Sequence, residues 1–140
     1  MKDLRILIDT NILVDFIAKR EPFVADARII IKLCQEKIVS GSISAHTVTN
    51  LFYILRKELP ADERKDTLRK FCRIFTVLGI DSFKLENALE NDMFNDFEDC
   101  LQDECAKEFM SDYIVTRNIK DFENSSVKAI KPDEFLKIID

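Results

Sequence analysis

Apolar residues occur along the chain in two spacings, which predict two kinds of element. Short runs dominated by apolar residues are typical of strands buried on both faces of a sheet. Four such runs predict strands over residues 4–9, 39–44, 76–80 and 113–116, and a fifth strand can form over residues 127–130. The first run ends on a carboxylate, Asp9, directly before an apolar pattern with helical spacing begins. Asp9 is therefore expected to end a strand where a helix starts.

Segments with apolar residues at every third or fourth position lie between these runs and predict amphipathic helices. The helices are expected over residues 11–18, 23–36, 45–59, 62–75, 83–91 and 96–109, with a last helix near Pro132. Ser82 is expected to cap the helix that follows it. Pro132 fits a first helical turn, because its missing N–H costs no hydrogen bond there. The alternation predicts an α/β fold, a parallel sheet of four to five strands with helices on both faces.

Length and composition indicate one globular domain without an internal linker. The 140 residues are 46% apolar and 34% charged, an ordinary balance for a folded protein, so a single domain over residues 1–140 is expected. No segment approaches the roughly 18 apolar residues of a membrane span. The N-terminus lacks the basic and small-residue regions of a signal peptide. We therefore expect a cytoplasmic protein with no membrane partner.

The histidine and cysteine residues argue against a structural zinc site. The chain has one histidine, His46, and its four cysteines show no C-x-x-C spacing. The cysteines are expected to be buried reduced thiols. His46 is expected to lie at the start of a helix.

Charge is distributed unevenly along the chain. The net charge is -5, which argues against a protein that coats nucleic acid without specificity. Residues 86–104 carry acidic side chains and no lysine or arginine, whereas basic side chains predominate over residues 56–73. Lys65, Arg69 and Arg73 recur every four residues and share one helix face. This face is either a solvated helix flank or a track for RNA.

Polar residues gather at or beside the carboxyl ends of the predicted strands, where open parallel sheets form their sites. The groups are Asp9, Thr10 and Asn11; Thr116, Arg117, Asn118 and Asp121; and the helix-start residues Asp96 and Asp99. Asp96 and Asp99 are three positions apart and therefore share one helix face. Carboxylates that converge repel one another unless a cation lies between them. Their oxygens suit magnesium or manganese.

Each group also has a purely structural interpretation. Asp9 can serve only as a helix cap, and Asp96 or Asp99 can be a helix-start carboxylate favoured by the helix dipole. Asn118 and Asp121 can simply close and cap a turn. None of the groups taken alone decides between a structural role and a site.

Four segments together resemble the successive motifs of PIN domains, in particular the VapC-type toxins of bacterial toxin–antitoxin pairs. They are ILIDTNILVDF, SAHTVTNLFYILRK, DFEDCLQDECA and DYIVTRNIKDF, and the resemblance covers nearly the whole chain. It implies a Rossmann-like, PIN-like sheet and a metal-dependent endoribonuclease that uses Mg²⁺ or Mn²⁺. Asp9 matches the first acidic position of the family and Asp99 the third. The second and fourth fall on Asn50 and Asn118, which keep a carbonyl oxygen but lack the charge.

The resemblance and the residues together give a set of predicted site residues. The expected metal ligands are Asp9, Asp99 and Asp96, and the expected catalytic residues are these three with Asn118 and Asp121. The residues expected to support them are Thr10, Asn11, Asn50 and Thr116. The residues expected to bind RNA are Arg117, Lys65, Arg69 and Arg73. Asp96 and Asp121 are the nearest candidates to compensate for the negative charges that Asn50 and Asn118 lack.

The expected function is cleavage of RNA phosphodiester bonds by the toxin of a toxin–antitoxin pair. The expected partners are an RNA substrate, a cognate antitoxin protein and a second copy in a homodimer. The aromatic segment at residues 51–53 is expected either in the core or at the dimer interface. The alternative is a catalytically weak PIN domain that binds RNA or protein. A phosphotransfer domain fits less well, because Asn11 stands where haloacid-dehalogenase-type phosphatases need a second aspartate.

Overall fold

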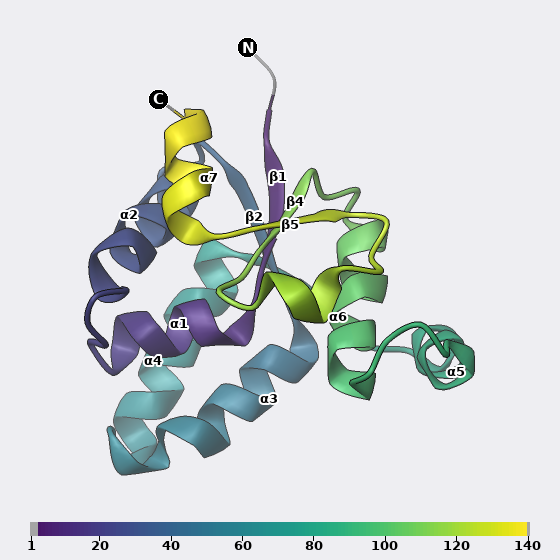
Figure 1. The fold of residues 1–140 in the computed structure, drawn as a ribbon. Coiled ribbons are helices and arrows are strands. Elements are labelled where there is room, and N and C mark those ends of the chain that lie inside the picture. The colour runs from purple at the N-terminus through teal and green to yellow at the C-terminus, as the bar shows by residue number, and fades with distance from the viewer. Residues whose placement is uncertain (1–2, 140) are drawn as a thin grey trace.

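Five strands form one sheet in the part of the chain that the structure, a computed structural model, describes, residues 3–139 (Figure 1). They are β1 (Arg5–Ile8), β2 (Ser40–Ser44), β3 (Thr76–Leu78), β4 (Tyr113–Val115) and β5 (Lys128–Ile130). Their order is β3-β2-β1-β4-β5, and every neighbouring pair is parallel. The predicted parallel sheet is confirmed, with the fifth strand included.

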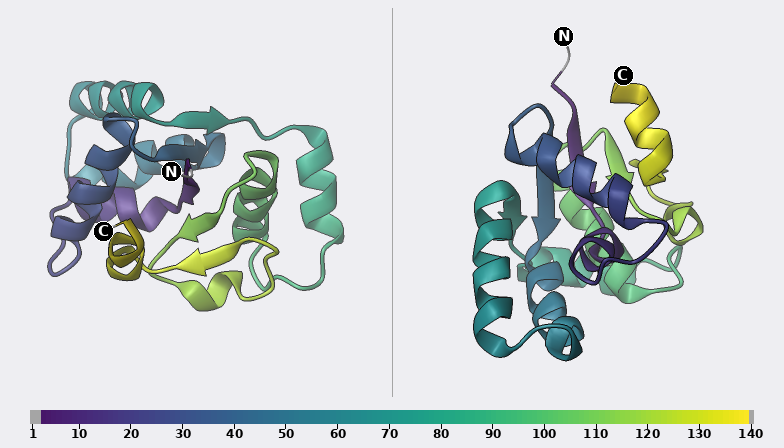
Figure 2. Two further views of the ribbon diagram at one scale, coloured as in Figure 1. Left: turned by 90° about the horizontal axis from the view of Figure 1, so that it is seen from above. Right: turned by 90° about the vertical axis from the view of Figure 1, so that its left-hand side faces the viewer.

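Seven α-helices surround the sheet within the described residues. They are α1 (Thr10–Ile17), α2 (Val24–Gln35), α3 (Ala45–Ile54), α4 (Ala61–Ile74), α5 (Ser82–Glu90), α6 (Phe97–Glu108) and α7 (Pro132–Ile139), with 3₁₀ turns η1 (Leu55–Lys57) and η2 (Ile119–Phe122). The helices cover both faces of the sheet, as predicted (Figure 2). None of these helices is long and apolar enough to span a membrane.

The cap predicted for α5 is wrong by one residue. The helix begins at Ser82, and the capping carboxylate is that of Asp81, which accepts a hydrogen bond from the Lys84 amide at 3.0 Å. An aspartate caps as well as a serine does, so composition alone does not choose between the two neighbours. Pro132 opens α7, as predicted.

The central strand β1 sends alternate side chains into two cores. Ile6 and Ile8 pack with α1, α2, α3, α4 and α7, whereas Leu7 packs on the opposite face with α6. All three side chains are fully buried. Each contributes about 2 kcal/mol of burial free energy, so the central strand is fixed in position from both faces.

A glycine allows two helices to close on the larger core. A Cβ at Gly41 of β2 would lie 2.6 Å from Cys34 Sγ and 3.0 Å from the Phe75 ring. Any other residue at this position would therefore have to push Cys34 and Phe75 away. Cys34 is buried there, but Cys72 on α4 is exposed. The prediction of buried thiols is wrong for Cys72, which lies on the outer side of its helix, and correct for the other three cysteines.

Strand order places the carboxyl ends of β1 and β4 side by side at the point where the chain reverses its direction of winding. From β1 the sheet extends through β2 on one side and through β4 on the other. Open α/β sheets form binding crevices at such a switch point. Ile8 pairs with Val115, and the Asp9 amide donates to the Val115 carbonyl at 3.0 Å. Asp9 and Thr116 therefore leave their strands together.

Candidate active site

A cleft of about 350 Å³ opens at this edge of the sheet, between α1, α3, α6 and η2. Seven of the predicted site residues line it: Asp9, Thr10, Asn11, Asn50, Asp99, Asn118 and Asp121. Four further polar residues line it that were not predicted: Arg20, His46, Glu98 and Gln102. Segments far apart in sequence thus meet in one polar cleft.

Asp9 is held at the floor of the cleft by four hydrogen bonds. Its carboxylate accepts from the Thr10 amide at 2.8 Å, Thr116 Oγ1 at 2.8 Å, Gln102 Nε2 at 3.2 Å and Asn11 Nδ2 at 3.3 Å. Burial raises the pKa of Asp9, and the bonds from Thr116, Gln102 and Thr10 oppose that rise. Asp9 also caps α1. The predicted helix cap is therefore confirmed, and the part of Asp9 in a metal site stays a prediction.

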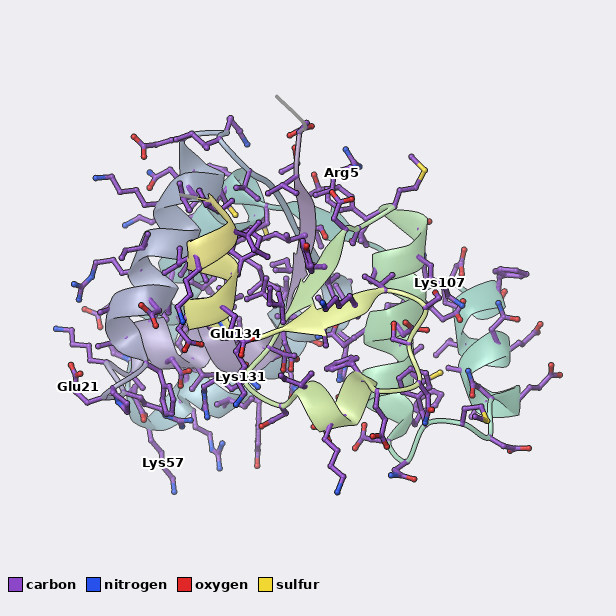
Figure 3. All side chains as sticks on the ribbon, turned by 45° about the horizontal axis from the view of Figure 1, so that its top comes forward. Arg5, Glu21, Lys57, Lys107, Lys131 and Glu134 are labelled. Atoms are coloured by element: carbon purple, nitrogen blue, oxygen red, sulfur yellow. The ribbon has the colours of Figure 1, made fainter. Side chains whose placement is uncertain are left out.

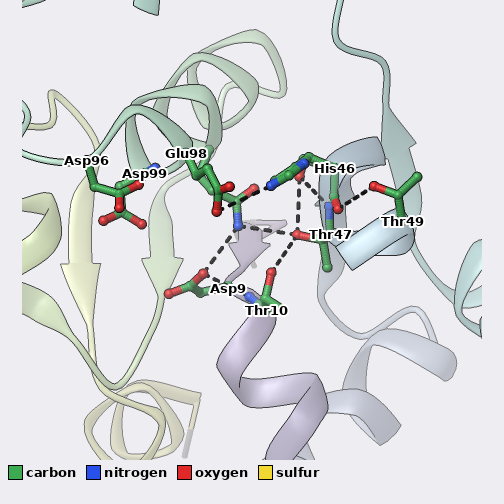
Figure 4. A network of polar contacts seen from close by, with 10 residues as sticks. Asp9, Thr10, His46, Thr47, Thr49, Asp96, Glu98 and Asp99 are labelled. Carbon is green, nitrogen blue, oxygen red and sulfur yellow. Dashed lines mark hydrogen bonds and ion pairs between the residues drawn. The ribbon is translucent and has the colours of Figure 1, made fainter. Parts of the chain in front are cut away.

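The hydrogen bonds continue from Asp9 into α3 (Figure 4). Gln102 Nε2 also donates to Thr47 Oγ1 at 3.3 Å, and the Thr10 and Thr47 hydroxyls are 2.9 Å apart. Ser44 caps α3 and donates to Thr47 Oγ1 at 3.2 Å. The Thr10 hydroxyl is thus engaged with Thr47, and its part in the cleft is to lock α1 against α3.

Asp99 lies in the first turn of α6, where the surroundings of its carboxylate differ from those of Asp9. Burial raises its pKa to about 7, and repulsion from Asp96, Asp9, Asp121 and Glu98 adds to this rise. None of the hydrogen bonds within residues 3–139 is donated to the Asp99 carboxylate. Asp99 is therefore a partly buried carboxylate surrounded by other carboxylates.

Asp96 has a different role from Asp99. It is exposed, and its side chain caps α6 by accepting a hydrogen bond from the Asp99 amide at 3.0 Å. Asp96 does not line the cleft. Because α6 begins at Phe97, Asp96 is the cap and Asp99 is the carboxylate that the first turn presents to the cleft.

The cleft offers oxygen donors of two kinds. Asn11 Oδ1 and Gln102 Oε1 are buried without a hydrogen-bond partner, beside the carboxylate of Asp9. Within residues 3–139, no three histidine, cysteine, aspartate or glutamate side chains converge closely enough to form a metal-binding group by themselves. Amide and carboxylate oxygens together are the ligands that Mg²⁺ and Mn²⁺ take. The donor chemistry therefore fits these cations, with Asn50 and Asn118 adding amides in place of charges.

Two residues missed by the sequence analysis have a signal that could have found them. Gln102 follows Asp99 by three positions and Thr47 precedes Asn50 by three, so each shares a helix face with a predicted residue. His46 lies at the start of α3, as predicted, but its Nε2 also lies 3.4 Å from Glu98 Oε2 across the cleft. No spacing in the sequence links these two segments.

Arg117 forms a bidentate ion pair inside the protein. Its Nε and Nη2 lie 2.6 and 3.2 Å from the two carboxylate oxygens of Asp15, which is fully buried. Its guanidinium also lies 4.1 Å from the centroid of the Phe23 ring. Arg117 thus fastens the loop after β4 to α1. Its predicted contact with RNA stays a prediction.

The other predicted RNA-binding residues are not brought to the cleft. Lys65, Arg69 and Arg73 line a separate hollow on α4 that shares no residue with it. Arg69 pairs with Asp66 of the same helix at 2.7 Å. The α4 face keeps the appearance of a solvated flank.

Comparison with known proteins identifies the family of this chain. The PIN domain model matches residues 5–120. Similar solved structures include a toxin–antitoxin complex from Klebsiella pneumoniae (22% identity, TM-score 0.66, 90% of this chain and 96% of that chain) and DNA-bound VapBC from Salmonella typhimurium (19%, 0.66, 92% and 98%). VapBC2 from Rickettsia felis, bound to a promoter DNA fragment, is a third (18%, 0.65, 91% and 98%). No curated protein matches the chain in sequence. The chain belongs to the PIN domain family.

Proposed function

We propose that the protein is a Mg²⁺- or Mn²⁺-dependent endoribonuclease and the toxin of a toxin–antitoxin pair. The observation that carries the proposal is the cleft at the switch point of the sheet. It gathers Asp9, Asp99 and Asp121 with the unpartnered oxygens of Asn11 and Gln102. Membership of the PIN domain family supports a nuclease.

The residues of the cleft would either hold the cation or fix the position of its ligands. Asp9 and Asp99 would hold the cation, and Asp121 with the amide oxygens of Asn11 and Asn118 would complete the polar surroundings of the cation. When bound, the cation would supply an acidified water and neutralise charge on the phosphate. Donors from three elements fix the Asp9 carboxylate before any ligand binds, and such fixed orientation strengthens a ligand residue.

Similar structures support the proposed protein partner. They include toxin–antitoxin complexes and VapBC complexes on DNA, and we infer a cognate antitoxin for this chain by that likeness. We also propose a homodimer. In the aromatic segment expected in the core or at a dimer interface, Leu51 is buried whereas Tyr53 is 63% exposed, so Tyr53 is the part of it open to a second copy.

A second candidate function is a PIN domain that binds RNA or protein with little catalysis. Asn50 and Asn118 in the cleft favour it, because each gives an oxygen without a charge. The absence of three converging acidic, histidine or cysteine side chains among residues 3–139 points the same way. Each carboxylate that is missing from a site weakens cation binding, because the Coulomb attraction between its charge and the cation is lost.

Cleavage assays separate the two functions. Purified protein is incubated with structured and unstructured RNA in magnesium, in manganese and in EDTA. We expect cleavage that depends on the divalent ion. If RNA is bound but remains intact with both ions, the protein is the binding module instead.

A further inference from the structure

The cleft continues along the surface into two more hollows. Asn118 and Asp121 belong both to the cleft and to a hollow of about 630 Å³ beside η2. Arg117 and Lys131 join that hollow to a third, of about 470 Å³, on which the Phe23 side chain lies. Lys131 lies between β5 and α7 (Figure 3) and lines both hollows. A continuous path therefore runs from the acidic cleft to an aromatic side chain.

The middle of this path carries two lysines and one carboxylate, that of Asp121. Lys120 and Lys131 are exposed, and neither forms an ion pair or hydrogen bond through its side chain within residues 3–139. The charge of Arg117 is already neutralised by Asp15. Two exposed lysines without an ion pair, beside an anionic cleft, are suited to phosphate groups, which bind mainly through such contacts.

The far end of the path is suited to a flat ring instead. Phe23 is 38% exposed, and the guanidinium that covers part of it is itself fixed by two bonds to Asp15. Bases stack on aromatic side chains of this kind in single-stranded nucleic acids. Asp26 and Asp133 line the same hollow; they repel phosphate but accept hydrogen bonds from the amino groups of bases.

We propose that these hollows bind single-stranded RNA beside the bond to be cut. Lys120 and Lys131 contact its phosphates, and Phe23 stacks on an unpaired base. A single strand is favoured, because an unpaired base can stack on Phe23 without the cost of breaking a base pair. This inference rests on the proposed ribonuclease function and replaces the α4 face as the RNA track, since that face has no continuity with the cleft.

The test measures binding of a fluorescently labelled single-stranded RNA of ~12 nucleotides by anisotropy in EDTA. Lys120→Gln/Lys131→Gln should weaken binding about tenfold and reduce the salt slope by about 1.4, that is about 0.7 for each of two phosphates. Phe23→Leu, which keeps apolar bulk, should weaken binding about fivefold or more through lost stacking. The matched control Lys32→Gln/Lys137→Gln removes two exposed lysines on α2 and α7 and should leave binding unchanged.

Photo-crosslinking gives a direct second readout that does not depend on stability. RNA containing 5-iodouridine should crosslink to the peptide that contains Phe23. The inference is wrong if the lysine pair behaves like its control, or if Lys65→Gln/Arg69→Gln/Arg73→Gln weakens binding more. Cleavage by the wild type would then leave the proposed function standing. If the wild type neither binds nor cleaves RNA, both proposals fail together.

Discussion

Two regions of the cleft hold their carboxylates in opposite ways. The strand-end region consists of the cleft residues Asp9, Thr10 and Asn11 together with Thr116, which donates to Asp9. The helix-end region consists of the cleft residues Glu98 and Asp99 together with Asp96, which caps their helix outside the cleft. Asp9 in the first is 9% exposed and accepts four hydrogen bonds. Asp99 in the second accepts none from residues 3–139, and its pKa is raised to about 7.

The difference shows what each region contributes. Four donors set the position of the Asp9 carboxylate in advance. Asp99 instead faces other carboxylates, so the helix-end region contains repulsion that a bound cation would relieve. A preformed strand end and a repulsive helix end are together what a cation site requires of the free protein.

The largest effect is expected from Asp9→Asn in the strand-end region. Asparagine can still accept bonds from the Thr10 amide and from Gln102, so the fold should remain. Loss of the charge should lower RNA cleavage by about a hundredfold or more, the scale for groups that act on transition-state charge. Asp62→Asn on the exposed start of α4 is the control. Near-normal cleavage by Asp9→Asn would remove this region from the active site.

Adding the two charges that the resemblance to PIN domains implies should strengthen cation binding and cleavage. Asn50→Glu/Asn118→Asp adds two carboxylates to the cleft, and we expect cation affinity and cleavage to rise about tenfold from added Coulomb attraction. The wild type should prefer manganese, because magnesium dehydrates more reluctantly at a weak site. Asn50→Gln/Asn118→Gln is the uncharged control. If the charged pair changes neither property, the asparagines belong to a working site as they are.

Thr116→Val tests how far the strand-end region depends on orientation. Valine keeps the shape of this buried side chain but removes its 2.8 Å bond to Asp9. Because that bond lowers the pKa of Asp9, its loss should move the acidic limb of the pH–rate profile to higher pH. Cleavage should fall about tenfold, as for other residues that orient a ligand. Thr116→Ser should restore both, and an unchanged pH profile in Thr116→Val would contradict this role.

The smallest effect is expected on the stability of Asp99→Asn without a cation, separate from the loss of cleavage that should follow when a cation ligand is removed. The folded pKa of about 7 lies above the ordinary value of 3.8, so the unfolded chain releases its proton first as pH rises. The free energy of unfolding should therefore fall between about pH 4 and pH 7 and stay low above it. In EDTA at pH 8, Asp99→Asn should be more stable than the wild type by on the order of 1 kcal/mol, after solvent screening. Urea unfolding at pH 5 and pH 8 checks this, with Asp62→Asn unchanged.

The strand-end region could be predicted from sequence, because parallel strands end at one edge of a sheet. Asp9 and Thr116 each come at the end of an apolar run, so both are expected at that edge, whereas their meeting there depends on β4 lying beside β1. Gln102 could not be placed in the same way, since its bond to Asp9 joins residues 93 positions apart. The pairing of Arg117 with Asp15, 102 positions apart, likewise depends on how α1 packs against the loop after β4.

The helix-end region depends on a single residue of helix boundary. Asp96 and Asp99 both suit a helix start, and sequence patterns fix such boundaries only to within a few residues. The structure begins α6 at Phe97, which makes Asp96 the cap and leaves Asp99 for the cleft. A start three residues later would have made Asp99 the cap and left Asp96 outside the helix.

The central claim is that the two regions bind one cation between them. Calorimetric titration of Mn²⁺ into the wild type, Asp9→Asn and Asp99→Asn tests it without any RNA. The account predicts binding by the wild type and at least a roughly tenfold loss of affinity in each variant, as expected when a charged ligand is removed. Wild-type affinity in Asp99→Asn, or no binding by the wild type at millimolar Mn²⁺, would contradict it.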